Sequence, residues 1–170
     1  LGRVTLYRSF PINASLMKTS GVDASLKYLH DIGRWGSLGF QVGYTHVFSF
    51  ETAQFSDSPL VDSRNDRNYN QVRWRSNVRV NWAYDDWNTS VYAHTQGGIP
   101  NNNQVTHPGR GSAFTLYNLD VSKQMIMEGM RVGLSVVNLL DTMPPEDDSF
   151  SNTGWPYFNQ RAYNPIGRQV

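Results

Sequence analysis

The feature that most constrains this chain is the alternation of apolar and polar side chains over long stretches. Successive side chains of a β-strand point to opposite faces of a sheet, whereas a helix would scatter both sets around its axis. Residues 71–84 therefore predict a strand with one apolar and one polar face. The first set is Val72, Trp74, Ser76, Val78, Val80, Trp82 and Tyr84, and the second is Gln71, Arg73, Arg75, Asn77, Arg79, Asn81 and Ala83.

The same alternation predicts further strands on both sides of this one. Residues 37–51 place Leu38, Phe40, Val42, Tyr44, Phe48 and Phe50 on one face. Before them, Val22, Ala24, Leu26, Tyr28 and Ile32 face away from Asp23, Ser25, Lys27 and Asp31. Weaker patterns predict strands over residues 87–96, 114–127 and 130–138. The chain is therefore expected to be all-β, with several strands longer than the usual five or six residues.

The connections between these strands alternate in length. Short turns and long loops of this kind lie on opposite sides of bacterial outer-membrane barrels, whereas a Greek-key sandwich keeps no such rule. The short turns are expected at 33–36, 85–86 and 128–129, and the long polar loops at 55–68, 97–113 and 141–159.

Aromatic residues gather beside the expected short turns, at Trp35, Trp82, Tyr84 and Trp87. Membrane barrels place amphipathic rings at the level of the lipid headgroups, so these positions favour an aromatic girdle, a belt of such rings at the membrane–water interface. The alternative is aromatic packing in the core of a soluble sheet, which explains the repeated long strands less well.

Composition excludes several classes of protein. The sequence has no apolar run of about twenty residues, so no transmembrane helix is expected. Its mean hydropathy of −0.51 is compatible with a barrel, in which only alternate residues meet lipid. A net charge of +1 argues against a nucleic-acid partner. The absence of cysteine excludes disulfide frameworks, zinc ribbons and thiol nucleophiles. Because residues 1–4 read like a strand rather than a signal peptide, we expect a segment of a larger polypeptide.

The end of the chain resembles the TonB-dependent outer-membrane receptors. Asn138-Leu139-Leu140-Asp141 is similar to the family's "NLFD" motif, with Leu140 in place of phenylalanine. Thr19–Asp23 is similar to the start of a family strand, "xGxD/E". Further similar segments are Asn118–Val121, Val132–Val137, Met143–Pro145, Gly154–Tyr157, Tyr163–Pro165 and Gly167–Gln169.

This resemblance implies a 22-stranded transmembrane β-barrel that is plugged by an N-terminal domain. Residues 1–170 would be the C-terminal portion of that barrel, an arc made of an antiparallel meander of long strands, without the plug domain and the closing strand. The implied function is active import of a siderophore, cobalamin or an oligosaccharide across the outer membrane of a Gram-negative bacterium. The implied partners are outer-membrane lipid, a nutrient ligand and, through the missing N-terminal part alone, the TonB complex. The resemblance implies neither enzymatic activity nor a cofactor.

Three arginines of the central strand, Arg73, Arg75 and Arg79, are candidate ligand-binding residues. They form a cationic wall that would draw anionic ligands into a lumen. The alternative is that they pair with acidic neighbours such as Glu51 or Asp120, and the usual role of charges on a polar strand face favours this structural interpretation.

Aromatic residues of the last long loop, Trp155, Tyr157 and Phe158, are the other candidates for ligand binding. Exposed rings on an extracellular loop can stack on a sugar or an aromatic chelator. The equally supported alternative is that they brace the loop against the barrel wall.

No motif predicts catalysis or a metal site. Glu146-Asp147-Asp148 and the cluster around Asp62 and Asp66 lack EF-hand spacing, so solvated loops are the better interpretation. His30, His46, His94 and His107 lack metal-ligand spacing, and the sequence has no Gly-x-Ser-x-Gly element.

Two other protein classes remain open. A soluble all-β carbohydrate-binding module would have strands of about six residues and a core between two sheets. A passive porin-type barrel would share the strands but lack the motifs near the end of the chain. An arc alone would expose two sheet edges and an apolar face, so the isolated segment is not expected to be a stable soluble monomer.

Overall fold

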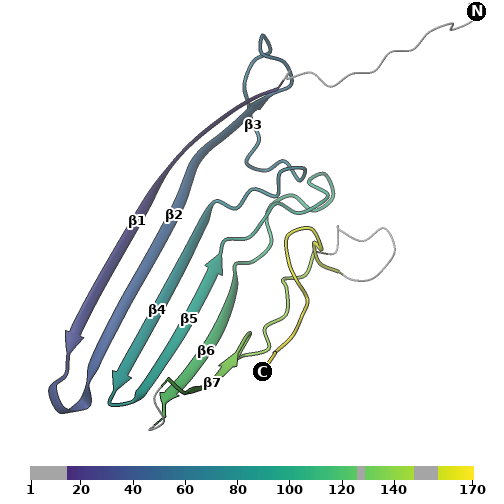
Figure 1. Cartoon of the computed structure of the whole chain (residues 1–170). Helices are drawn as coiled ribbons and strands as arrows, with labels where there is room; N and C mark the ends of the chain where they lie inside the picture. The colour runs from purple at the N-terminus through teal and green to yellow at the C-terminus, as the bar shows by residue number, and fades with distance from the viewer. Residues whose placement is uncertain (1–14, 126–128, 148–156) are drawn as a thin grey trace, which may run out of the picture.

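The computed structural model describes residues 15–125, 129–147 and 157–170. These residues form one antiparallel sheet of seven strands and contain no α-helix. Figure 1 shows long, tilted strands side by side in a single layer. The elements are β1 (Leu16–Asp31), a 3-10 turn η1 (Gly33–Trp35), β2 (Ser37–Ala53), β3 (Val61–Asp62), β4 (Trp74–Tyr84), β5 (Trp87–Gln96), β6 (Phe114–Gln124) and β7 (Arg131–Val136).

The sheet is a meander in which sequence neighbours pair, in the order β1-β2-β4-β5-β6-β7, with the short β3 added to β2. The predicted all-β class and antiparallel meander are confirmed. The predicted strand over 87–96 matches β5, and β1 begins earlier than expected, at Leu16. Since β1 and β7 do not pair, the sheet is open at both edges.

The predicted alternation of connections is confirmed for the part of the chain that the structure describes. Figure 1 shows the turn between β1 and β2 and the turn between β4 and β5 at one end of the sheet, and the long connections at the other. Gly36 closes the first turn with a φ of +88°, and a Cβ there would lie 2.0 Å from the carbonyl oxygen of Ala83. Only glycine fits this position, because both the backbone angle and the close approach exclude a side chain.

Strand register assigns every paired residue to one of two faces. Residues directly opposite each other in an antiparallel pair share a face. Phe40 of β2 lies between Tyr28 of β1 and Val80 of β4 on the apolar face, whereas its neighbour Gln41 lies between Lys27 and Arg79 on the polar face. The predicted segregation of β4 into two faces is therefore continued across the sheet.

A bulge in β2 changes the face of one predicted residue. Gly21 pairs with Val47 and Ser20 pairs with Ser49, so Phe48 is left unpaired. The extra residue shifts the alternation by one position. Phe50 therefore lies opposite Thr19, on the polar face, rather than beside Tyr44 as the sequence pattern predicted. There it is buried, with its ring edge-on to Tyr69.

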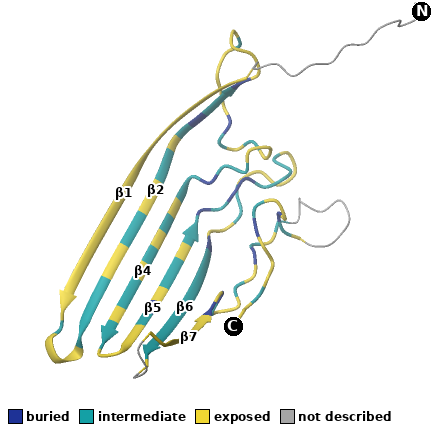
Figure 2. Ribbon diagram, viewed as in Figure 1, coloured by how far each residue is buried: buried dark blue, intermediate teal, exposed yellow. Residues whose placement is uncertain are grey.

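The sheet has no second layer among the described residues. Figure 2 shows β1 exposed over its whole length and exposed or half-buried residues over most of the other strands. Leu26 and Leu134 on the apolar face are 65% and 53% exposed. The buried hydrophobic cluster, Val72, Ile99, Phe114 and Tyr163, lies instead at the end of the sheet that carries the long loops. This arrangement differs from the two-sheet core expected of a soluble sandwich.

The chain returns to the outer edge of β7 near residue 169. Val137 and Gln169 exchange backbone hydrogen bonds of 2.9 and 3.0 Å in an antiparallel bridge. The Asp141 carboxylate accepts a hydrogen bond from the backbone N–H of Arg168 at 2.8 Å. Residues 167–169, which the sequence marked as the approach to a further strand, thus begin to extend the sheet beyond β7.

Candidate functional site

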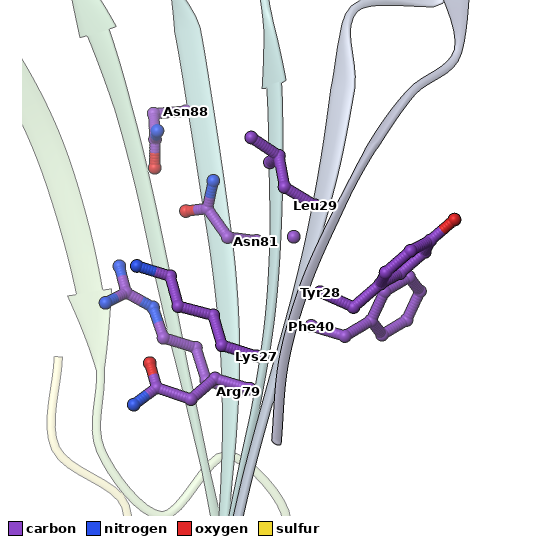
Figure 3. Close-up of a pocket in the computed structure, with 9 residues that line it drawn as sticks. Lys27, Tyr28, Leu29, Phe40, Arg79, Asn81 and Asn88 are labelled. Atoms are coloured by element: carbon purple, nitrogen blue, oxygen red, sulfur yellow. The ribbon is translucent and has the colours of Figure 1, made fainter. Parts of the chain in front are cut away.

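The candidate site is a trough on the polar face of the sheet. Two hollows of about 380 and 450 Å3 share Gln41 and Arg79 in their linings. Figure 3 shows Lys27, Arg79, Asn81 and Asn88 on one side of the strands, while Tyr28 and Phe40 project from the other. We call the polar side chains of these hollows the polar trough: Lys27, Gln41, Asn77, Arg79, Asn81, Asn88, Tyr92, His94 and Asn118.

Glycines of β2 give the trough its depth. Gly39 and Gly43 flank Gln41 on the same face, because they lie two residues to either side of it. A Cβ at Gly43 would have no atom within 4 Å. The neighbouring strands therefore supply the walls, and the backbone of β2 supplies part of the floor.

Arg79 is the fixed cation of the trough. Its guanidinium carbon lies 4.9 Å from the ring centroid of Tyr92, and its Nη2 is 3.3 Å from the Ser90 hydroxyl. Ser90 donates in turn to the Asn81 side-chain oxygen at 2.7 Å. These contacts hold the guanidinium in one place on the polar face without neutralising its charge.

The predicted pairing of the strand arginines with Glu51 or Asp120 is not found. In the described parts of the chain, no carboxylate lies within ion-pair distance of Arg73, Arg75 or Arg79, and the ion pair observed joins Arg64 to Asp62 at 2.6 Å. Asp120 accepts a hydrogen bond from the Ser135 hydroxyl at 2.5 Å instead.

The three arginines also do not form one wall. Arg75 and Arg79 lie on the polar face of β4, and Arg75 lines a separate, smaller hollow. Arg73 lies just before β4, in the long connection, where its Nη2 donates to the side chain of Asn65 at 3.2 Å. The alternation predicted that Arg73 is a strand residue, but the regular strand begins at Trp74, and only the Arg73 carbonyl still accepts a hydrogen bond from β2, from the backbone N–H of Val47 at 2.8 Å.

A second arrangement, which the sequence did not reveal, joins the long loops. Arg110 donates from Nε to the carbonyl of Gly98 at 2.8 Å and from Nη1 to that of Arg64 at 2.8 Å. It also donates to the carbonyl of Gln71 and to the Asn65 side chain. Burial, together with the nearby positive charge of Arg73, lowers the pKa of Arg110 to about 10, so it stays charged at neutral pH.

The same loops hold the predicted polar cluster in ordinary turn contacts. The Arg64 guanidinium hydrogen bonds to the Asp62 carboxylate and lowers the pKa of Asp62 to about 2. Asp66 accepts the backbone N–H of Asn68 at 2.8 Å, and Asn70 accepts from the buried Asn159 at 2.9 Å. These side chains therefore take part in the hydrogen bonds that shape the loop.

Of the aromatic candidates in the last loop, Phe158 is half-buried against the hydrophobic cluster. Tyr157 is 47% exposed. Trp155 lies outside the described residues. Phe158 thus packs within the loop end of the sheet, and the role of Tyr157 and Phe158 in ligand binding stays a prediction.

No metal site is found in the described segments, where no group of three or more acidic, histidine or cysteine side chains converges. The histidines are dispersed as predicted, and each has a local partner. His30 and His46 contact Tyr28 and Tyr44, His94 contacts Asn77, and His107 contacts Thr106. No helix in the described part of the chain is long and apolar enough to cross a membrane.

The apolar face carries aromatic rings near both ends of β4. Near the short turns, Trp82 stacks on Tyr84 with ring centroids 5.8 Å apart, and its Nε1 donates to the backbone of Trp35 at 2.9 Å. At the other end, Trp74 stacks on Tyr44 at 6.4 Å. Between these two groups, β4 itself presents only Ser76, Val78 and Val80 on this face, and Phe40 of β2 lies beside Val80.

No protein-family model, no curated protein and no solved structure matches the chain.

Proposed function

We propose that the chain is part of an outer-membrane active transporter of the TonB-dependent receptor kind, forming an arc of its 22-stranded transmembrane β-barrel. Such a protein imports a scarce nutrient, a siderophore, cobalamin or an oligosaccharide, with energy from the TonB complex. The observation that carries the proposal is a single-layer sheet of long strands with one uncovered apolar face and one polar face. A sheet of this kind needs lipid on one side and a polar lumen on the other.

The dimensions of the apolar face support a membrane position. Ten residue steps separate Trp74 from Tyr84 along β4, which correspond to about 33 Å of strand at roughly 3.3 Å per residue. At the tilt of about 40° usual for such barrels, this length spans about 25 Å, the height of the apolar band between aromatic girdles.

The open edges support a larger barrel rather than a complete small one. In lipid, every backbone polar group must be paired, so an open sheet needs further strands to close it. At β7 the first such pairing is already present, through Gln169. The tight turn at Asn138–Asp141 positions it, with the Asn138 side chain bonded to the backbone of Thr142 at 2.8 and 3.0 Å.

Two alternatives differ from this proposal, one in where the protein lies in the cell and the other in whether transport needs an energy source. A soluble carbohydrate-binding module would be recovered with the soluble proteins. A passive porin-type barrel would let solutes diffuse through it without an energy source. The experiment is fractionation of cells that express the whole gene product, followed by uptake assays in the wild type and a gene deletion. The panel contains ferric siderophores, cobalamin and oligosaccharides.

We expect the protein in the outer-membrane fraction, resistant to extraction by carbonate and by high salt. Uptake of at least one solute is expected to fall in the deletion strain and to stop when a protonophore collapses the inner-membrane proton gradient. Recovery in the soluble fraction would overturn the membrane assignment, and uptake that survives the protonophore would point to a passive barrel.

A further inference from the structure

The polar trough has an unbalanced charge. Its lining contains Lys27 and Arg79 but no acidic residue. The acidic residues of the same face that are nearest in the strand register each accept a hydrogen bond. Asp23 accepts from Thr45 and Asp120 from Ser135, each at 2.5 Å, and Asp31 accepts from the backbone N–H of Gly33 at 2.8 Å. Within the described segments, neither trough cation has a carboxylate at ion-pair distance. Two cations on the facing walls of the trough, Lys27 on β1 and Arg79 on β4, raise the local concentration of anions.

The free hydrogen-bonding groups of the trough are mainly donors, which, like the positive charges, suit an anionic ligand. Asn77, Asn81 and Asn118 each use the side-chain oxygen within the sheet, towards His94, Ser90 and the backbone N–H of Asn138. An amide whose oxygen is occupied offers its NH2 group as a donor. The trough therefore presents mainly donors, from three amides and two cations, to whatever enters it.

A donor-rich cationic surface selects ligands that carry acceptors and negative charge. Carboxylates form charge-assisted hydrogen bonds with guanidinium and ammonium groups, and hydroxyl oxygens accept from amide NH2 groups. Hollows of about 380 and 450 Å3 are within the usual range for small-molecule sites. We propose that the polar trough binds a small hydroxylated carboxylate, of which a sugar acid is the simplest example.

This proposal rests on the proposed function, because the trough faces a lumen only if the sheet is a barrel wall. Beyond that function, a hydroxylated carboxylate would be the class of solute bound on the polar face, and the trough residues would select it. Lys27 and Arg79 supply the charge, and Asn77, Asn81 and Asn118 supply neutral donors for hydroxyl groups.

The test uses a thiol as a reporter of the local potential in the outer-membrane protein. Gly43→Cys places the thiol in the trough at a position where a Cβ meets no atom within 4 Å. We compare its modification rates with an anionic methanethiosulfonate (the sulfonatoethyl reagent) and a cationic one (the trimethylammonioethyl reagent). Both rates are normalised to those of free 2-mercaptoethanol. Ser25→Cys, at the residue paired with Gly43, is a second reporter should the first variant fail to reach the membrane.

The normalised anionic-to-cationic rate ratio is expected to be about tenfold above unity. Adding Arg79→Gln or Lys27→Gln is expected to lower it about threefold or more. Arg131→Gln is the matched control, because it removes the same charge from the same face. It lies four strands from Gly43, at least about 19 Å away at 4.8 Å per strand and beyond the Debye length, so the ratio should be unchanged.

Ligand class is tested by protection against the uncharged methyl methanethiosulfonate. Galacturonate is expected to slow modification of Gly43→Cys, whereas galactose at the same concentration and sodium chloride at the same ionic strength are not. A high rate ratio without protection by galacturonate would refute the hydroxylated carboxylate, as would equal protection by galactose.

Two further results would overturn the proposal. The first is a rate ratio that Arg79→Gln and Lys27→Gln leave unchanged. The second is a thiol that no reagent reaches until the protein is unfolded, which would mean that another part of the polypeptide fills the trough. Neither result depends on the fractionation experiment, so failure of the ligand assignment is distinguishable from failure of the membrane assignment.

Discussion

Replacing Val80 by arginine is expected to destabilise the membrane-inserted protein by about 2–4 kcal/mol, the range for a cation near the midplane of a barrel's lipid face. Val80 lies in the middle of the apolar face, between Phe40 of β2 and Val91 of β5. A guanidinium there must be buried in hydrocarbon or must bend a long way towards water. The measurement is guanidinium-induced unfolding of the full gene product in phospholipid vesicles, followed by tryptophan fluorescence.

Asn81→Arg is the matched control for this change. Asn81 is the next residue of β4 and lies on the polar face, beside Gly39 and Ser90. The same side chain there points away from the lipid and removes one acceptor, that of the Ser90 hydroxyl, so the expected cost is about 1 kcal/mol. Equal costs for the two variants would contradict the assignment of the two faces.

Loss of the Arg110 side chain is expected to have the second largest effect, but only on the long loops. Arg110→Ala removes the donors that reach the carbonyls of Gly98, Arg64 and Gln71. Hydrogen bonds to a charged group contribute about 1.5–3 kcal/mol, and exposure of the opened loops to water offsets part of the loss. A net cost of about 2–3 kcal/mol corresponds to a rise of roughly 30- to 150-fold in the population of opened loops.

Limited proteolysis of the loops in intact outer membranes measures this population, provided that cleavage is slow relative to loop closing. Arg110→Lys is expected to fall between the alanine variant and the wild type, because a lysine cannot reproduce the fork of donors. Arg161→Ala is the control, since Arg161 is exposed and, among the residues that the structure describes, forms a hydrogen bond only through its backbone N–H. Cleavage of the Arg110→Ala variant at the wild-type rate would show that Arg110 does not hold the loops together.

The strands were predictable from the sequence because their cause is local. Alternation follows directly from the geometry of an extended chain, so β5 and the start of β2 were placed correctly. The bulge was not predictable, because Phe48 and Phe50 stay in phase with Tyr44 in the sequence. Only the pairing of Gly21 with Val47 and of Ser20 with Ser49 shows that the phase changes.

The candidate site was predictable only in part, because its residues come together through pairing between strands. Arg79 stood out as a cation on a polar face, but its neighbours Lys27 and Tyr92 lie on β1 and β5 and are joined to it by register. Arg73 was misplaced because alternation does not show at which residue a regular strand begins, here Trp74. Arg110 gave no signal, since one of its carbonyl partners, that of Arg64, lies 46 residues away in the sequence.

The proposed function requires that one face of the sheet meets lipid and that the other does not. Because these 170 residues contain no cysteine, single cysteines can be introduced and labelled with a small fluorophore. On the apolar face they replace Ser76, Val78 and Val80, and on the polar face they replace Asn77 and Asn81. Brominated phospholipids then quench only the fluorophores that touch acyl chains. The unsubstituted protein reports any background labelling elsewhere in the gene product.

Quenching at residues 76, 78 and 80 but not at 77 and 81 is the predicted result, with the strongest quenching at Val78 and Val80, the two residues nearest the middle of the apolar band. Equal quenching on both faces, or none at any position, would contradict a membrane wall. The apolar face would then have to be covered by protein.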